Sequence, residues 1–299
     1  MDGLPLEEGT ADAPSWLSWS LRRPGRSGHA LVDGRRLHYL EWDGPGPSAR
    51  TVLLVHGFRG HAHWWDGIAP HLAEDFRVLA LDLSGMGDSD PRSVYPIEFA
   101  ALDIIDLLDA LRPGPVLGIG HSYGGSRMLR ACADRPDLFE RLIVCDSFVL
   151  LPGVAIPTDT ASTSTAKRHY PDLQQAMSRY RLMPEQPGSE PAMLDHIARH
   201  SLHQEAAGWC WKFDPILPRG VANEEQGTSY LPRVQRPVDV VHGECSVIVD
   251  RELARQCVQL LPQGRGPLGM PGTHHHMMID QPLAMIAMLR GLLATERQT

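Results

Sequence analysis

Short, largely apolar runs recur along the chain and predict its main strands. They lie at residues 51–55, 76–81, 115–119, 141–145 and 238–241, with a short edge strand expected at 267–270. A run that is continuously apolar is typical of a strand buried on both faces of a parallel sheet. Segments compatible with helices alternate with these runs, at residues 64–73, 97–111, 126–133, 250–261 and 283–295. This alternation predicts an α/β protein with a doubly wound, mostly parallel sheet.

The first strands are expected to form a hairpin. Residues 29–32 and 36–42 flank Asp33-Gly34, a dipeptide that favours a two-residue turn between antiparallel strands. The segment before them is rich in Pro, Gly, Ser and Arg and predicts a loosely held lead-in. Trp16 and Trp19 would hold this lead-in to the surface.

A long middle segment interrupts the alternation and divides the chain. At residues 148–232 the apolar runs give way to polar helical or loop-like segments with Pro, Met and Trp, including a Ser/Thr-rich stretch at 161–165. We expect this segment to be an inserted helical cap without strands, lying over the strand ends. The predicted organisation is therefore a lead-in at 1–28, an α/β core formed by 29–147 and 233–299, and the cap.

Composition and charge narrow the classes of partner. The chain has 299 residues, of which 42% are hydrophobic and 21% charged, enough for one large α/β domain with an insertion. Its formal net charge of −8 offers no electrostatic support for a nucleic-acid partner. A neutral or modestly charged small molecule is the expected substrate, and the sequence gives no indication of oligomeric state.

The N-terminus and the cysteines predict a cytoplasmic protein. Residues 1–8 are acidic and lack the positive and apolar regions of a secretory signal, and no apolar run approaches the length of a membrane span. The five cysteines form no Cys-x-x-Cys pair, which favours buried thiols in a reducing compartment over disulfides or a zinc cage. They are Cys132, Cys145, Cys210, Cys245 and Cys257.

A Gly-x-Ser-x-Gly pentad at residues 120–124 supplies a candidate nucleophile. It lies between an apolar run and a helix-compatible segment, so the sequence reads strand, sharp turn, helix, with Ser122 at the turn. Such a turn exposes the serine hydroxyl beside the unpaired N–H groups of a helix N-terminus. A serine hydroxyl also needs a base, and His274, His275 and His276 are the late candidates.

With these residues the chain resembles the α/β-hydrolase family from Arg36 to Leu293. Two further motifs support the resemblance. One is His-Gly-Phe at 56–58, and the other is residues 82–89, which resemble the family's Asp-x-x-Gly-x-Gly-x-Ser loop. The family's base commonly lies five residues before an acidic-x-Pro triplet. Asp280-Gln281-Pro282 therefore places the base at His275. The resemblance, strongest to a branch of acyl thioesterases and esterases, implies a serine hydrolase that needs no metal or organic cofactor.

The histidine base of such a site needs an acidic residue to orient it, and here this chain departs from the commonest pattern of the family. The residue expected to be aspartate after the strand at 238–241 is Ser246. Asp146 follows the strand after the nucleophile's helix, a position that some similar proteins use, and it is the favoured acid. Glu244 and Asp250 are the alternatives, although an aspartate that begins a helix also has a structural explanation.

The resemblance also implies an oxyanion hole and a substrate pocket. The main-chain N–H groups of Phe58 and Tyr123 would hold the oxyanion, because one follows His-Gly and the other follows the nucleophile. Tyr123 as an acid is a weaker alternative. The candidate pocket residues are His121, Arg59, Met183, Trp209 and Trp211, the last two in an aromatic run that we expect to be a cap helix.

A second histidine motif precedes the first long helix. His61-Ala62-His63 resembles the His-x-His opening of the metallo-β-lactamase family, but Trp64-Trp65 follows where that family has Asp-His. We therefore expect this motif to begin a helix whose tryptophans pack inward. No metal ligand is assigned from the sequence, since three adjacent histidines such as 274–276 point in different directions.

The predicted function is hydrolysis of a carboxylic ester or thioester of a small or acyl substrate through an acyl-enzyme. A carbon–carbon bond hydrolase or a cofactor-free perhydrolase would use the same serine and histidine. Epoxide hydrolase and haloalkane dehalogenase chemistry is disfavoured, because it needs a carboxylate where Ser122 stands. A receptor-like binding protein on a hydrolase scaffold is the alternative from another class.

Overall fold

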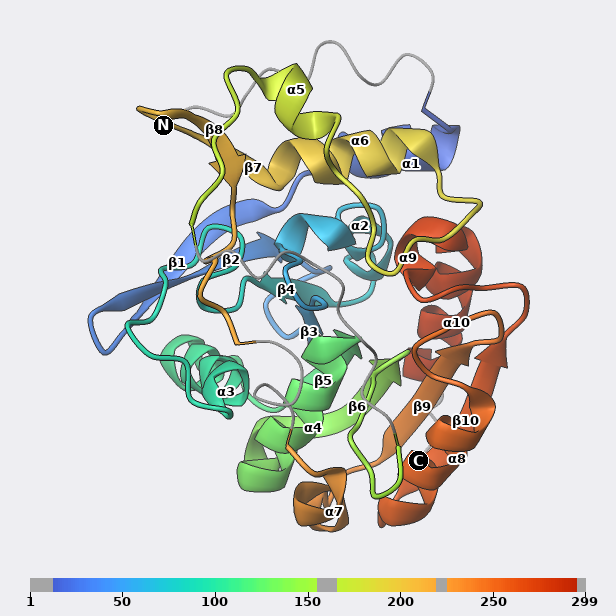
Figure 1. Cartoon of the computed structure of the whole chain (residues 1–299). Coiled ribbons are helices and arrows are strands. Elements are labelled where there is room, and N and C mark those ends of the chain that lie inside the picture. The colour runs from blue at the N-terminus through green and yellow to red at the C-terminus, as the bar shows by residue number, and fades with distance from the viewer. Residues whose placement is uncertain (1–12, 155–165, 219–224, 295–299) are drawn as a thin grey trace.

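An eight-stranded sheet forms the centre of the computed structural model, which describes residues 13–154, 166–218 and 225–294 (Figure 1). The spatial order is β1-β2-β4-β3-β5-β6-β9-β10. Strand β2 pairs antiparallel with both β1 and β4, and the strands β4, β3, β5, β6, β9 and β10 are parallel to one another. The bounds are β1 Arg26–Val32, β2 Arg35–Trp42, β3 Thr51–Val55, β4 Arg77–Leu81, β5 Val116–His121, β6 Phe139–Cys145, β9 Val238–Gly243 and β10 Gly264–Met270.

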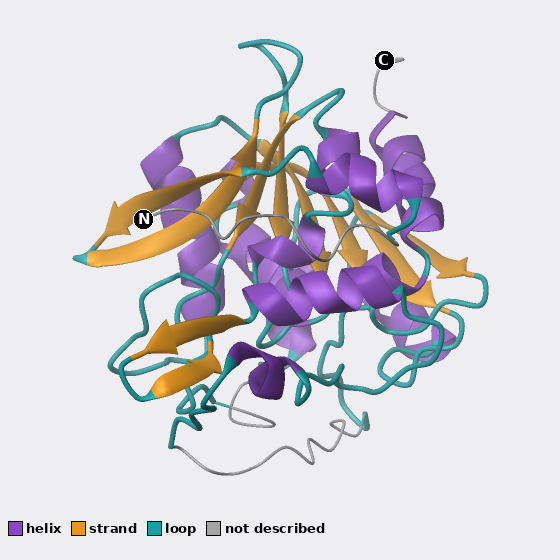
Figure 2. Cartoon of the chain, turned by 90° about the horizontal axis from the view of Figure 1, so that it is seen from above, coloured by secondary structure: helices purple, strands orange, loops and turns teal. Residues whose placement is uncertain are grey.

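Helices cover both faces of the sheet (Figure 2). One face carries α3 (Phe99–Leu111), α4 (Tyr123–Asp134) and α8 (Arg251–Leu260), and the other carries α1 (Ser15–Leu21), α2 (Ala69–Leu72) and α10 (Pro282–Ala294). Alternate residues of β3 enter the two cores, Leu53 on one side and Val52 on the other. The predicted doubly wound, mostly parallel α/β fold is therefore confirmed.

The N-terminal region is more ordered than its composition suggested. The structure places α1 within the predicted lead-in and begins β1 at Arg26, three residues before the predicted strand. Leu17 is fully buried, and Trp19 stacks on His71 with ring centroids 4.5 Å apart. The predicted hairpin is confirmed, with Asp33 and Gly34 both at positive φ.

The predicted helix at 64–73 is wrong in form. The structure has a short 3₁₀ helix, η1 (Ala62–Trp65), and then α2, separated at Gly67. Gly67 lies against Trp16 and Met193, and a Cβ atom there would come within 3.3 Å of the Trp16 ring. The expected inward packing of Trp64 and Trp65 is confirmed, because both are buried.

The inserted segment contains strands as well as helices. Its elements are α5 (Leu173–Met177), α6 (Pro191–His200), β7 (Leu202–Glu205), β8 (Gly208–Trp211) and α7 (Gly227–Tyr230). The β7–β8 pair is antiparallel, so the prediction of a cap without strands was wrong, as was the aromatic helix at Trp209 and Trp211. Tyr170 pairs with Trp209 through two main-chain hydrogen bonds of 2.8 Å, which extends the strand pattern. The stretch 161–165 lies outside the described residues.

Three further short elements are η2 (Pro136–Leu138), η4 (Leu231–Arg233) and α9 (Met277–Asp280). The predicted last helix ends at Ala294, and residue 295 lies outside the described part. Four of the five cysteines are buried free thiols as expected, whereas Cys245 is exposed. None of the helices within residues 13–154, 166–218 and 225–294 is long and apolar enough to cross a bilayer.

Candidate active site

Ser122 lies in the sharp turn between β5 and α4. Its backbone has φ 52° and ψ −123°, a left-handed conformation that a non-glycine residue rarely adopts, and its N–H donates to Cys145 O at 2.9 Å. The glycines around it permit this turn. A Cβ atom at Gly124 would collide with the carbonyl oxygen of His56, and one at Gly120 would collide with Gly125. The pentad therefore forms the predicted strand–turn–helix.

His275 and Asp146 meet at the carboxyl ends of the central strands. His275 Nδ1 lies 2.6 Å from Asp146 Oδ2. A carboxylate can only accept from this ring, so Nδ1 carries the proton and Nε2 is left as the acceptor of the neutral imidazole. Asp146 directly follows β6, has φ 49° and is fully buried. The fold thus delivers one of the predicted bases to one of the predicted acids.

Two further donors hold the Asp146 carboxylate. Gly243 N donates to Oδ1 at 2.8 Å, and Ser246 Oγ donates to Oδ2 at 2.5 Å. Ser246 stands where the family commonly has its acid, so in this chain that position supplies a hydrogen bond to the acid instead. Sequence reasoning missed this role, because no local pattern links Ser246 to a residue 100 positions earlier.

The two alternative acids lie elsewhere. Asp250 is the N-cap of α8, where its carboxylate accepts from Leu253 N at 2.7 Å. Glu244 is exposed on the turn after β9. Among the hydrogen bonds of the described residues, the only carboxylate that joins His275 is that of Asp146.

The neighbouring histidines have separate partners. His274 Nδ1 lies 3.0 Å from Asp280 Oδ2, while His276 is buried with its ring 5.3 Å from that of Trp64. His121 is buried too, and its Nε2 lies 2.8 Å from the carbonyl oxygen of His275. Burial, with a further contribution from His275, lowers the pKa of His121 to about 3. His121 is therefore neutral and donates to the main chain of the candidate base, rather than lining an open pocket as predicted.

The His-Gly-Phe loop lies directly against Ser122. A Cβ atom at Gly57 would be 3.2 Å from that of Ser122, a distance that only glycine makes comfortable. The His56 ring holds this loop in place through two hydrogen bonds. Its Nδ1 donates to Gly57 O at 2.7 Å, and its Nε2 accepts from Leu83 N at 3.2 Å. Phe58 and Tyr123, the two predicted oxyanion donors, follow these residues, and their rings make an edge contact at 5.5 Å.

Arg59 continues this aromatic layer. Its guanidinium carbon lies 4.3 Å from the centre of the Phe213 ring and 5.6 Å from that of Phe58. Within the part of the chain that the structure describes, the Nε and Nη2 atoms of Arg59 are buried and make no hydrogen bond. Two nitrogens of this half-buried side chain therefore lack an acceptor among the described residues, which is costly for a guanidinium.

The other predicted pocket residues lie in the inserted segment. Met183 is 54% exposed. Trp209 and Trp211 are half-buried and pack against a small apolar cluster formed by Tyr170, Ala176 and Leu202. This packing gives the tryptophans a structural role within the cap.

The comparisons with known proteins agree with this fold. Residues 52–288 match the alpha/beta hydrolase family, and the chain belongs to that family. It is 26% identical over 228 residues to the esterase Rv0045c of Mycobacterium tuberculosis, an alignment that covers 73% of this chain and 74% of the relative. The solved structure of that esterase has a TM-score of 0.71 and 21% identity, covering 98% of this chain and all of the other.

Two further similarities involve hydrolases of other kinds. A crystal structure of E-2-(acetamidomethylene)succinate hydrolase superposes with a TM-score of 0.72 at 20% identity, covering 90% of this chain and 99% of that one. A soluble epoxide hydrolase from Corynebacterium sp. is 35% identical over 126 residues, but the alignment spans only 42% of each protein. These relatives share the family and differ in substrate.

Proposed function

We propose that this protein is a serine hydrolase that cleaves a carboxylic ester or thioester of a small or acyl substrate. Ser122 Oγ attacks the carbonyl carbon while His275 Nε2 accepts the hydroxyl proton, and Asp146 stabilises the imidazolium that results. The observation that carries this proposal is the hydrogen bond of 2.6 Å between Asp146 and His275, because it fixes the tautomer that a general base requires. The esterase Rv0045c supports the same chemistry by similarity.

The rest of the cycle follows from these positions. The main-chain N–H groups of Phe58 and Tyr123 donate to the oxyanion, each stabilising it by about 3 kcal/mol. His275 then returns its proton to the departing alcohol or thiol, which leaves an acyl group on Ser122. A water molecule deprotonated by His275 releases the acid and restores the serine hydroxyl. Every proton passes through His275, so no cofactor is required.

The serine at position 122 determines which related reactions this site can carry out. Epoxide opening by a covalent mechanism needs a carboxylate at this position, so similarity to a soluble epoxide hydrolase over 42% of the chain does not transfer that activity. Carbon–carbon bond hydrolysis and perhydrolysis would use the same residues.

We place the enzyme in the cytoplasm, and the free cysteine thiols support that location. Residues 148–232 would form its cap.

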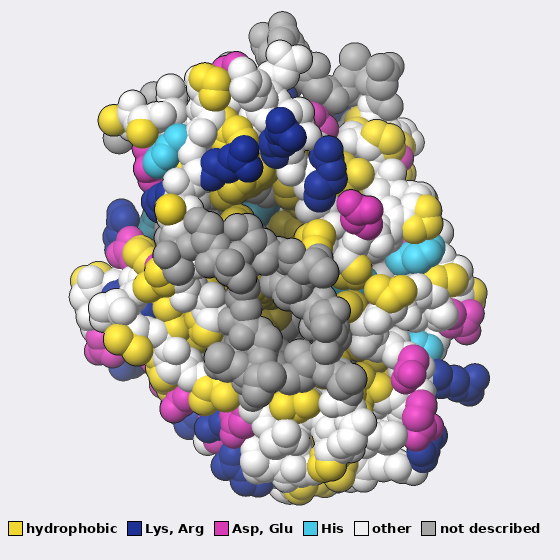
Figure 3. Space-filling view, viewed as in Figure 1, with side chains coloured by type: hydrophobic (Ala, Val, Ile, Leu, Met, Phe, Trp, Pro, Cys, Tyr) yellow, Lys and Arg dark blue, Asp and Glu magenta, His cyan; other side chains and the backbone are white. Residues whose placement is uncertain are grey.

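A negatively charged substrate is favoured by Arg59. Arg59 follows the proposed oxyanion donor Phe58, and its two buried nitrogens without an acceptor among the described residues would bind a carboxylate carried by the acyl group. The cap adds exposed Arg168, Arg179 and Arg181, and Lys and Arg side chains gather over the cap in Figure 3. The name 2-(acetamidomethylene)succinate hydrolase shows that one relative acts on a compound with carboxylates.

A panel of p-nitrophenyl esters, acyl-CoA thioesters and lactones tests this function. We expect turnover of at least one ester or thioester class, and its loss in Ser122→Ala. A folded protein that hydrolyses none of them would contradict the proposal and favour a binding protein on the same scaffold. Activity that survives in Ser122→Ala would remove the serine from the mechanism.

A further inference from the structure

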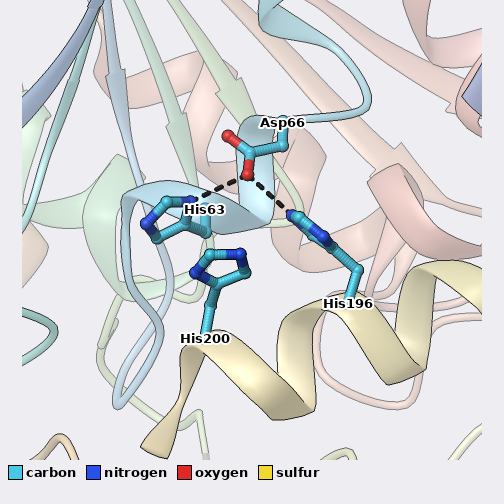
Figure 4. A group of neighbouring side chains, drawn as sticks. All are labelled: His63, Asp66, His196 and His200. Atoms are coloured by element: carbon cyan, nitrogen blue, oxygen red, sulfur yellow. Dashed lines mark hydrogen bonds and ion pairs between the residues drawn. The ribbon is translucent and has the colours of Figure 1, made fainter. Parts of the chain in front are cut away.

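Four side chains, none of them assigned to hydrolysis, converge where the core meets the cap (Figure 4). His63 and Asp66 come from η1 and the residue that follows it, and His196 and His200 come from α6. Each offers one nitrogen or oxygen atom, and these atoms all lie within 4.8 Å of one another. We call this group the core–cap cluster.

The side chains of the η1 segment and of α6 face each other. His196 and His200 are four residues apart and so share one face of α6. Asp66 Oδ2 accepts from His63 Nδ1 at 2.8 Å and from His196 Nε2 at 2.7 Å. The His200 ring stacks on that of His63, with centroids 3.8 Å apart. Its nitrogens take part in none of the hydrogen bonds found among the described residues, and Asp66 Oδ1 is buried without a partner.

The charge states suit a cation. Burial would raise the pKa of Asp66, but His63 and His196 outweigh it and hold that pKa far below its usual range, so the carboxylate is ionised. Burial, together with His63 and His196, lowers the pKa of His200 to about 2, which keeps this imidazole neutral. Metals bind the ionised carboxylate and the neutral imidazole, so His63, whose pKa the Asp66 carboxylate raises against the effect of burial, must release a proton when an ion binds. Lys212 is the nearby cation, and it is paired with Asp88 at 2.7 Å.

We propose that His63, Asp66, His196 and His200 form a site for a divalent transition metal ion of the zinc type, which ties cap helix α6 to the core. Three imidazole nitrogens and one carboxylate oxygen complete a tetrahedral set, and closing the ligand atoms to about 3.3 Å from one another would give Zn–N and Zn–O distances of about 2.0 Å. His63, Asp66 and His196 are 18%, 10% and 12% exposed, so an ion can enter from solvent. On binding, the ion replaces the ring proton that His63 and His196 each donate to Asp66. A neutral ring then carries its proton on the other nitrogen, and a ring protonated on both nitrogens releases one proton to solvent.

Co²⁺ and Zn²⁺ binding to untagged, EDTA-stripped protein tests this site. We expect one ion per chain, the visible absorption bands of tetrahedral Co²⁺, and a Tm that rises with Zn²⁺. His200→Ala removes a ligand but none of the hydrogen bonds to Asp66, so it should fold without metal and bind Zn²⁺ at least about 100-fold more weakly. His29→Ala, on exposed β1, is the matched control and should bind as wild type does.

The outcomes separate a metal site from a hydrogen-bonded cluster. Tetrahedral bands that disappear in His200→Ala and persist in His29→Ala support the proposal. No bands in the wild-type protein, or bands that His200→Ala retains, overturn it and leave Asp66 as a carboxylate bridging two histidines. His200→Cys adds a further check, because a thiolate at this position should restore Zn²⁺ binding.

Discussion

Asp146 Oδ2 lies 2.6 Å from His275 Nδ1, although the two residues are 129 positions apart and the acid follows β6 rather than β9. Because β6 and β9 are neighbours in the sheet, a carboxylate at the end of either strand can reach the same imidazole. Ser246, on the turn after β9, then donates to Asp146. The candidate acid thus lies one strand away from the position after β9 and still contacts the candidate base.

Asp146→Asn should lower kcat by about 10³- to 10⁴-fold, because an amide no longer holds His275 in the tautomer that accepts the serine proton. Steady-state kinetics on the best ester measures the loss. Asp250→Asn and Glu244→Gln are matched controls, since one keeps a helix-cap acceptor and the other is exposed. Full activity in Asp146→Asn would show that another acid serves His275.

Ser246→Ala should lower kcat by about 10-fold with little change in KM, because it removes one hydrogen bond to a buried charged acceptor. Ser246→Thr keeps the hydroxyl and should stay close to wild type. The Tm of both variants must be compared, since Ser246 Oγ also accepts from Ile248 N at 3.1 Å. Equal activity in the alanine and threonine variants would mean that the hydroxyl does not support Asp146.

Arg59→Ala should lower kcat/KM for a p-nitrophenyl hemisuccinate about 10- to 100-fold and leave a neutral p-nitrophenyl ester of similar length nearly unchanged. The reason is the loss of a charge-assisted, bidentate contact to the carboxylate. Arg255→Ala, which changes an exposed arginine of α8, is the control. If Arg59→Ala weakens both esters equally, the side chain supports the loop and does not select the substrate.

Stability should fall in acid, in part through His121. Its folded-state pKa of about 3 lies below the ordinary value of 6.5, so between these pH values only the unfolded chain binds the proton. Each such group lowers the free energy of unfolding by up to about 1.4 kcal/mol per pH unit as the pH falls. Urea unfolding from pH 7 to pH 4 should therefore be less pH-dependent in His121→Gln, by about one proton. An unchanged slope would mean that His121 is already charged in the folded protein.

Trp211→Ala tests how far the cap reaches the substrate. Since Trp211 packs near Tyr170 and Tyr180, with ring centroids 6.1 Å and 6.2 Å away, we expect a loss of stability of about 3 kcal/mol and equal effects on acetate and long-chain esters. Thermal unfolding and ester kinetics check the two parts. A loss confined to long-chain esters would place the acyl chain against this ring instead.

The sequence predicts the core well because its signals are local. Continuous apolar runs such as 51–55 are the buried strands of the sheet, and the pentad around Ser122 needs only its own glycines to form the turn. The resemblance to the family located His275 as well. These features depend on residues that are adjacent in the chain, or on motifs in a fixed order.

Contacts between distant segments account for most of what the sequence did not show. The hydroxyl of Ser246 meets Asp146 only because β6 and β9 lie side by side. The β7–β8 hairpin has four-residue strands, too short to show an alternating pattern. The core–cap cluster joins His63 to His196 and His200, more than 130 residues later, so a spacing search near His61 could not find these ligands.

Covalent labelling of Ser122 tests the central claim most directly. A fluorophosphonate reacts only with a serine whose proton a neighbouring base removes, and intact mass followed by peptide mapping identifies the residue. We predict one adduct per chain in the wild-type protein and in Ser229→Ala, an exposed serine of α7, and none in Ser122→Ala. A folded wild-type protein that stays unlabelled, or a label that persists in Ser122→Ala, would contradict the assignment of Ser122 as the nucleophile.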